Sequence, residues 1–177
     1  HMLAAQAPAT DVLFVDTGLH FPQTLELRDE FARRFRLNFI TLHPELTVAD
    51  QKEKYGRHLF LHDENDGPGY PECCRLRKEA PFVKAAHGRY QAILSGLTRA
   101  DGDARASIGI VSRDPRIDGF RVNPLARWTH EQIDDYTDKH SIPTHPLYEL
   151  GYSSIGCSTC TTPVCPLEPN RAGRWRH

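Results

Sequence analysis

The chain has 177 residues with 22 Lys and Arg against 23 Asp and Glu, a net charge of −1. This length suits one domain with a sizeable core, expected over residues 1–177, and contents of 39% hydrophobic and 25% charged residues exclude disordered and collagen-like classes. The balanced charge argues against binding to nucleic acid, and the absence of a long apolar run or a signal-peptide pattern predicts a cytoplasmic protein that does not span a membrane.

Strand and helix signals alternate in the first part of the chain. Residues 11–15 form an apolar run that ends at Asp16-Thr17-Gly18, a pattern typical of a buried parallel strand followed by a functional loop. Pro22 begins a predicted helix whose apolar residues recur every fourth position up to Phe35. Residues 37–42 are a second predicted strand.

The same alternation continues towards the C-terminus. Residues 62–71 are rich in glycine and acidic side chains, which predicts a loop that leads into a helix ending near residue 88. Residues 90–96 are a third predicted strand, and Thr129 with Gln132 forms a capping-box signal for a further helix. The order favours an α/β fold with an open, mostly parallel sheet flanked by helices, in which sites lie beyond the carboxyl ends of the strands.

The five cysteines point to metal binding or thiol chemistry, because disulfide frameworks are uncommon without a secretory signal. Cys73 and Cys74 are adjacent, and Cys157 with Cys160 forms a C-x-x-C pair. Four thiolates suit a [4Fe-4S] cluster, while a tetrahedral zinc site and a redox or buried dithiol are the alternatives. Cys165 has no partner in this scheme and is expected to be a buried small hydrophobe, with a reactive thiol as the alternative.

Two arginine pairs are candidates for binding a small anion, because guanidinium groups bind phosphate and sulfate oxygens through paired hydrogen bonds. Arg99 and Arg105 lie in a loop after the third predicted strand, and Arg171 and Arg174 lie near the C-terminus. Taken separately, each pair also fits a solvated or ion-paired surface.

Arg77 and Lys78 lie one helical turn after Cys74. A cation there offsets the negative charge of thiolates and can face an anionic substrate, whereas the alternative is an ordinary exposed basic helix end. His58 and His62 have the i, i+4 spacing of two metal ligands but lack the glutamate of H-E-x-x-H, so a structural or surface role is expected.

Six segments occur in one order along nearly the whole chain. They are Val15-Asp16-Thr17-Gly18 with His20-Phe21-Pro22-Gln23-Thr24, Cys73-Cys74 with Arg77-Lys78, Gly96-Leu97-Thr98-Arg99-Ala100-Asp101-Gly102 with Arg105, Asn123-Pro124-Leu125 with Trp128-Thr129, Gly151-Tyr152-Ser153-Ser154-Ile155-Gly156-Cys157 with Cys160-Thr161, and Arg171-Ala172-Gly173-Arg174-Trp175. Together they resemble the assimilatory sulfonucleotide reductases, specifically the cluster-bearing adenylyl-sulfate (APS) reductases of bacteria.

The resemblance implies an enzyme of sulfate assimilation that reduces APS to sulfite and AMP on an adenine nucleotide alpha hydrolase-like, Rossmann-like fold. In that family a thiol on a C-terminal tail attacks the sulfur, AMP leaves, and thioredoxin reduces the S-sulfocysteine to release sulfite. It also implies a [4Fe-4S] cluster bound by Cys73, Cys74, Cys157 and Cys160, with Lys78 in a supporting role between the cluster and the phosphosulfate. The residues that the resemblance assigns to substrate are Asp16, Thr17, Gly18, Lys78, Arg99, Arg105, Arg171 and Arg174.

Three features depart from the family pattern. The family's first strand and phosphate-binding loop have no counterpart before Asp11, its tail cysteine has none after Trp175, and Thr98 stands where the family usually has Arg. We therefore expect a shortened form of an active reductase, incomplete at the N-terminus and without a catalytic cysteine. The alternatives are a non-catalytic or divergent paralogue that binds a sulfonucleotide, and a nucleotide-dependent sulfur or adenylyl transferase. A homo-oligomer is compatible with the sequence.

Overall fold

The computed structural model of the chain describes residues 1–61 and 71–176. Its α-helices are α1 (Met2–Gln6), α2 (Pro22–Phe35), α3 (Val48–Tyr55), α4 (Glu72–Cys74), α5 (Ala80–Ala86) and α6 (His130–Lys139). Its strands are β1 (Asp11–Val15), β2 (Asn38–Leu42), β3 (Ala92–Leu94), β4 (Val111–Asp114) and β5 (Gly119–Val122), and short 3-10 turns cover 99–105, 146–150 and 158–160. In the described part of the chain, no helix is long and apolar enough to cross a membrane.

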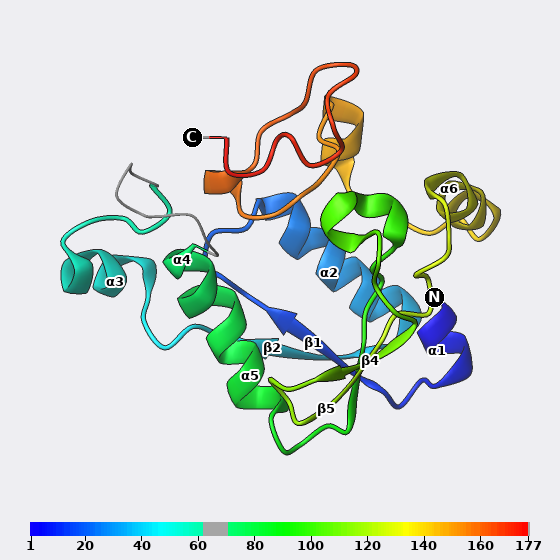
Figure 1. Cartoon of the computed structure of the whole chain (residues 1–177), viewed down its shortest axis with the longest axis horizontal. Helices are drawn as coiled ribbons and strands as arrows, with labels where there is room; N and C mark the ends of the chain where they lie inside the picture. Colours follow the sequence, from blue (N-terminus) through cyan, green and yellow to red (C-terminus); the bar gives the residue numbers. More distant parts are fainter. Residues whose placement is uncertain (62–70, 177) are drawn as a thin grey trace.

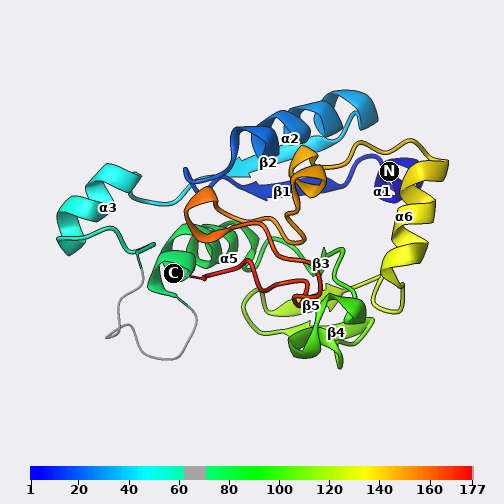
Figure 2. The ribbon, with the colours of Figure 1, turned by 90° about the horizontal axis from the view of Figure 1, so that it is seen from above.

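The first layer of the fold is the parallel pair β1 and β2, in register from Asp11 opposite Asn38 to Val15 opposite Leu42. Figure 2 shows α2 on one side of this pair and α5 on the other. The predicted strand, helix and strand over residues 11–42 are confirmed. The helix begins at Pro22, whose missing amide hydrogen is not needed in the first turn, and ends before Arg36, which adopts a left-handed conformation with φ 51°.

The cysteine-bearing helix is continuous from residue 72 to residue 86, which confirms the predicted helix ending near residue 88. Its middle, Arg75–Glu79, is a π-helical turn in which the Ala80 amide donates to the Arg75 carbonyl. Pro81 follows directly and has no amide hydrogen to donate to the carbonyl of Arg77, so a local widening accommodates it. This turn carries both Arg77 and Lys78.

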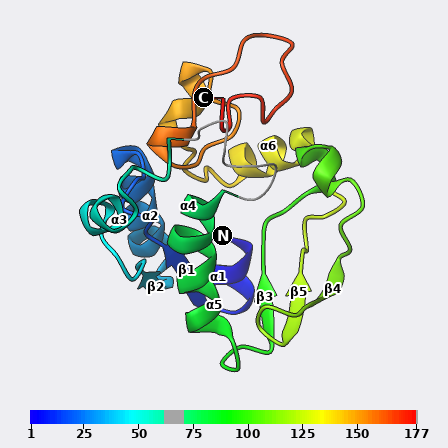
Figure 3. The ribbon, with the colours of Figure 1, turned by 60° about the vertical axis from the view of Figure 1, so that its left-hand side comes forward.

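The second group of strands contains β3 paired parallel with β5, and β4 paired antiparallel with β5. The predicted third strand is confirmed in its central residues 92–94, whereas the β4–β5 hairpin was not predicted. The mostly parallel sheet is therefore present, but in the described residues it is hydrogen-bonded in two parts rather than one. Figure 3 shows β1 apart from β3–β5. A groove of about 200 Å³ is lined by residues 11–13 and 92–94 among others, so it lies between β1 and β3.

Two of the described α-helices have reciprocal caps at their first turn. The capping box predicted at Thr129 and Gln132 is present at the start of α6. An equivalent box at Thr47 and Asp50 begins α3, a helix that was not predicted.

The C-terminal part of the chain after α6 is mainly irregular and lies at the carboxyl end of β1 (Figure 1). One backbone bridge joins His20 to Cys157, and a second joins Thr161 to Arg174. The first bridge brings the C-x-x-C pair next to the loop after β1, and the second brings Arg174 next to that pair. The candidate site is built where these segments meet.

Candidate functional site

Four buried cysteines from two distant segments lie in one neighbourhood. Cys73 and Cys74 come from α4, and Cys157 and Cys160 flank the 3-10 turn at 158–160. Their exposed fractions are 6%, 4%, 4% and 4%, and all four are free thiols. The hydroxyl of Thr17, in the loop after β1, lies 3.3 Å from the sulfur of Cys157.

Two of these thiols have raised pKa values. Burial, followed by the neighbouring thiols of Cys74, Cys160 and Cys157, raises the pKa of Cys73 to about 12. Burial also raises the pKa of Cys160. In residues 1–61 and 71–176, no three His, Cys, Asp or Glu side chains are arranged so that they could hold a metal ion. Burial therefore favours the protonated thiol at Cys73 and Cys160, and the positive charge of Arg77 opposes this effect at Cys73.

Arg77 is a buried cation whose hydrogen bonds join the loop after β1 to the cysteine-bearing helix. Only 3% of the residue is exposed, and its Nε donates to the carbonyl of Thr17 at 2.6 Å. Its Nη1 donates to the carbonyl of Leu46 and to Oε1 of Gln51. Gly18 has a φ of 69°, and a Cβ there would lie 3.1 Å from the guanidinium. The alternative of an exposed basic helix end is therefore wrong for Arg77.

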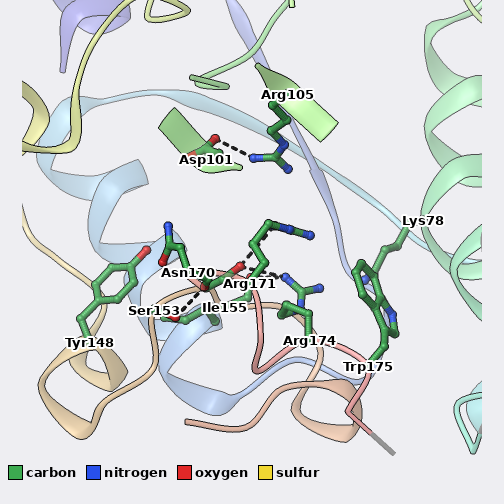
Figure 4. Close-up of a pocket in the computed structure, with 11 residues that line it drawn as sticks. Lys78, Asp101, Arg105, Tyr148, Ser153, Ile155, Asn170, Arg171, Arg174 and Trp175 are labelled. Carbon is green, nitrogen blue, oxygen red and sulfur yellow. Dashed lines mark hydrogen bonds and ion pairs between the residues drawn. The ribbon is translucent and has the colours of Figure 1, made fainter. Parts of the chain in front are cut away.

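Figure 4 shows a basic cleft of about 480 Å³. It lies near the cysteines, because its lining residues Lys78 and Arg174 interact electrostatically with their thiols. Four cationic side chains line it, and Asp101 is the acidic residue among the lining residues. The full lining set is Lys78, Asp101, Arg105, Tyr148, Ser153, Ser154, Ile155, Asn170, Arg171, Arg174 and Trp175. The structure thus brings together four of the predicted substrate residues, namely Lys78, Arg105, Arg171 and Arg174.

The arginines of the cleft are held by specific partners. Arg105 donates to the carboxylate of Asp101 at 2.6 Å. Arg171 and Arg174 both donate to the hydroxyl of Ser154, at 3.2 and 3.4 Å. The guanidinium carbons of this pair lie 5.7 and 4.8 Å from the ring centre of Trp175, within cation–π range.

Electrostatics in the cleft favour an anionic ligand. Burial lowers the pKa of Arg171, and the nearby positive charges of Arg105 and Arg174 lower it further. Burial also lowers the pKa of Arg174, an effect that the thiols of the cysteine neighbourhood oppose. Three crowded guanidinium groups with one carboxylate leave a net positive charge, which a phosphate or sulfate group neutralises.

A second hollow, of about 430 Å³, shares Lys78 with the basic cleft. It is lined by Val15 at the end of β1, by Lys78, Glu79 and Phe82 of the cysteine helix, and by Arg116 between β4 and β5. Sequence reasoning singled out neither Glu79 nor Arg116, because no motif joins a helix residue to a hairpin turn 37 positions away. Sequence reasoning also did not assign Tyr148, Asn170 or Ser154 to the site, although Ser154 lies inside a quoted motif.

The remaining predicted substrate residues lie outside the basic cleft. Arg99 is exposed and its Nε donates to the carbonyl of Ile108. Thr17 is 1% exposed, and its carbonyl accepts a hydrogen bond from Arg77. The carboxylate of Asp16 accepts a hydrogen bond from the Gly18 amide. None of these three loop residues lines the cleft.

Two further expectations concern Cys165 and the histidine pair. Cys165 is exposed, so the expectation of a buried small hydrophobe was wrong. Its amide donates to the carboxylate of Glu168, which also pairs with Arg176 in a surface loop. His58 stacks on Phe60 at 4.8 Å between ring centres and lies in a turn rather than a helix, and His62 lies outside the described residues.

Comparison with solved structures defines the fold class. A phosphoadenylyl-sulfate (PAPS) reductase from Candida auris, in a phosphate complex, superposes with a TM-score of 0.74 at 24% identity, covering 91% of this chain and 75% of that one. An FMN adenylyltransferase from Candida glabrata gives 0.57 at 17% identity, covering 99% of this chain and 56% of that one. The fold is therefore the α/β fold that these two enzymes share.

Comparison of sequences gives the family. Residues 1–163 match the phosphoadenosine phosphosulfate reductase domain. An adenosine 5'-phosphosulfate reductase from Mycolicibacterium smegmatis is 40% identical over 98% of this chain and 71% of its own length. One from Streptomyces coelicolor is 39% identical over 99% of this chain and 71% of its own length. The chain belongs to the phosphoadenosine phosphosulfate reductase domain family, the oxidoreductases that reduce sulfonucleotides in sulfate assimilation.

Proposed function

We propose that the chain binds adenosine 5'-phosphosulfate (APS) with the phosphosulfate group in the basic cleft. We further propose that it takes part in the reduction of APS to sulfite and AMP. The observation that carries the proposal is the convergence of Lys78, Arg105, Arg171 and Arg174 on one cleft next to four buried cysteines. A phosphosulfate has anionic oxygens on both phosphorus and sulfur. Several guanidinium groups and an ammonium group can therefore bind both ends at once.

The reaction that we propose transfers a sulfonate group to a thiolate. The thiolate attacks the sulfur, an S–S bond forms, and the bond between sulfur and the bridging oxygen breaks to release AMP. A dithiol, which we propose to be that of thioredoxin, then attacks the S-sulfocysteine, releases sulfite and becomes a disulfide. Sulfur is thereby reduced by two electrons, and the dithiol supplies them. This dithiol chemistry suits the cytoplasm, where thiols are kept reduced.

The residues of the cleft have distinct roles in this scheme. The guanidinium groups of Arg171 and Arg174 bind and orient the anionic end, held in place by Ser154 and Trp175. Arg105, fixed by Asp101, closes the opposite side of the cleft. Cations aimed at the bridging oxygen stabilise the negative charge that develops as AMP leaves.

We further propose that Cys73, Cys74, Cys157 and Cys160 hold a [4Fe-4S] cluster. The chemistry of the donors fits such a cluster, because four buried thiols lie together near the buried cation Arg77, although among the described residues these side chains are not already arranged around a metal ion. Iron would bind the four sulfurs as thiolates, whose negative charge Arg77 would partly offset. Such a cluster supplies a fixed charge distribution beside the cleft, which Lys78 and Arg174 adjoin.

The nucleoside fits the second hollow. Lys78 lines both spaces, so a ligand whose phosphosulfate lies in the basic cleft extends past Lys78 towards Val15 and Phe82. The aromatic ring of Phe82 and the apolar end of β1 suit a base and a sugar. The hollow lies at the carboxyl end of β1, which is where open α/β sheets generally bind their ligands.

The natural full-length polypeptide, incubated with APS and reduced thioredoxin, is expected to release one sulfite per AMP. Omission of thioredoxin should limit AMP release to at most one per chain and prevent the release of sulfite. Cys165→Ser, which removes an exposed thiol outside the cleft, should leave the rate unchanged. Pyrophosphate release from ATP in place of sulfite release would contradict the proposal and favour an adenylyl transferase.

A further inference from the structure

We infer that Glu79 is a specificity-determining residue that disfavours a phosphate on the 3′-oxygen of the bound nucleotide. The inference rests on the proposed function, since it assumes that the nucleoside occupies the second hollow. The carboxylate of Glu79 would explain why the site prefers APS over its 3′-phosphorylated analogue.

The position of Glu79 is the first observation. The residue follows Lys78 directly in the π-helical turn, and its carboxylate lies on the wall of the hollow with 34% of the side chain exposed. A ligand anchored by Lys78 therefore brings its ribose close to this carboxylate. A phosphate monoester carries nearly two negative charges near neutral pH, so a 3′-phosphate would meet a like charge there.

The second observation is that the guanidinium of Arg116 is already paired with carboxylates of the protein. Arg116 supplies the guanidinium group that lines this hollow, but its Nε and Nη2 donate to the two oxygens of the Asp114 carboxylate at 2.8 and 2.6 Å. Its Nη1 faces the carboxylate of Glu79 at 3.6 Å. Asp114 has a side-chain exposure of only 5% and also pairs with Arg121 at 2.9 Å, so the network is centred on a buried carboxylate.

The charges of this network of two arginines and two carboxylates therefore balance without a ligand. Arg116 and Arg121 contribute two positive charges, and Asp114 and Glu79 contribute two negative charges. Lys78 is the remaining cation among the residues that line the hollow, and in the proposed pose it is occupied by the phosphosulfate. Among the described residues, a 3′-phosphate finds no uncommitted cation in the hollow, whereas neutral ribose hydroxyls can donate hydrogen bonds to the Glu79 carboxylate.

The test compares the binding of AMP and adenosine 3′,5′-bisphosphate by titration calorimetry, which needs no turnover. The wild-type protein is expected to bind AMP at least about tenfold more tightly than the bisphosphate, because like charges repel across a partly exposed site. Glu79→Gln should reduce this preference about tenfold, mainly by improving bisphosphate binding. Glu79→Lys should abolish or reverse it.

Asp118→Asn is the matched control, because it removes an exposed carboxylate that pairs with Arg113 in the same hairpin but does not line the hollow. It should leave both affinities unchanged. The preference of the wild-type protein should also weaken as salt is added, since screening reduces the repulsion.

Two outcomes distinguish the failure of the inference from the failure of the proposed function. AMP binding with the same preference in wild type, Glu79→Gln and Glu79→Lys would overturn the role of Glu79 and leave the proposed function standing. Absence of AMP binding to the wild-type protein would overturn the proposed function and this inference together.

Discussion

Replacing Arg171 by alanine is expected to weaken AMP binding by about 10- to 100-fold. Hydrogen bonds between charged partners contribute about 1.5–3 kcal/mol, and every 1.4 kcal/mol changes an equilibrium constant tenfold. Arg171 is half-buried in the basic cleft, held by Ser154 and packed against Trp175, so its guanidinium is positioned before a ligand arrives. Titration calorimetry with AMP measures the effect directly.

The matched control for this change is Arg176→Ala. Arg176 lies five positions further along, pairs with Glu168, and does not line the cleft. Its removal should change AMP affinity less than twofold, and neither variant should unfold at a clearly lower temperature. Equal AMP affinity in Arg171→Ala and wild type would show that the cleft does not bind the nucleotide's phosphate.

Gly173→Ala is expected to destabilise the fold by about 1–3 kcal/mol and to weaken AMP binding at the same time. A Cβ at this position would overlap the carbonyl oxygen of Thr162, whose own amide donates to the Gly173 carbonyl at 2.9 Å. The neighbouring Trp175 amide donates to the carbonyl of Cys160. Separation of these two segments would therefore move Arg174 away from the cysteine neighbourhood.

Chemical denaturation and AMP titration measure the two effects of Gly173→Ala. Ala172→Gly serves as the control, because it changes the adjacent position without adding an atom that overlaps the backbone. A Gly173→Ala protein with wild-type stability and affinity would contradict the close packing of residues 160–162 against residues 173–175.

Local patterns predicted much of the fold. The apolar run at Asp11–Val15, the helix begun by Pro22 and the capping box at Thr129 depend on interactions within a few residues, and the structure confirms them. The β4–β5 hairpin was missed because both strands are four residues long and carry charged and exposed positions. The division of the sheet was also missed, because no local signal reports which strand edges meet.

The site was predictable to a different degree in each part. Spacing alone paired Cys73 with Cys74 and Cys157 with Cys160, and the structure brings the two pairs together. The convergence of arginines from positions 105 and 171–174 depends on backbone bridges between distant segments, so the family resemblance predicted it and composition did not. Cys165 was placed wrongly because its type favours burial, whereas it lies in an exposed loop in which its amide donates to the carboxylate of Glu168.

We propose that a basic cleft for a sulfonucleotide lies beside a four-cysteine iron–sulfur site. The most direct test of this proposal is the content of iron, acid-labile sulfide and zinc per chain, measured on protein purified without oxygen. We predict about four iron and four sulfide per chain, lost in Cys73→Ser and retained in Cys165→Ser. One zinc per chain without sulfide, or iron content that does not depend on Cys73, would contradict the account.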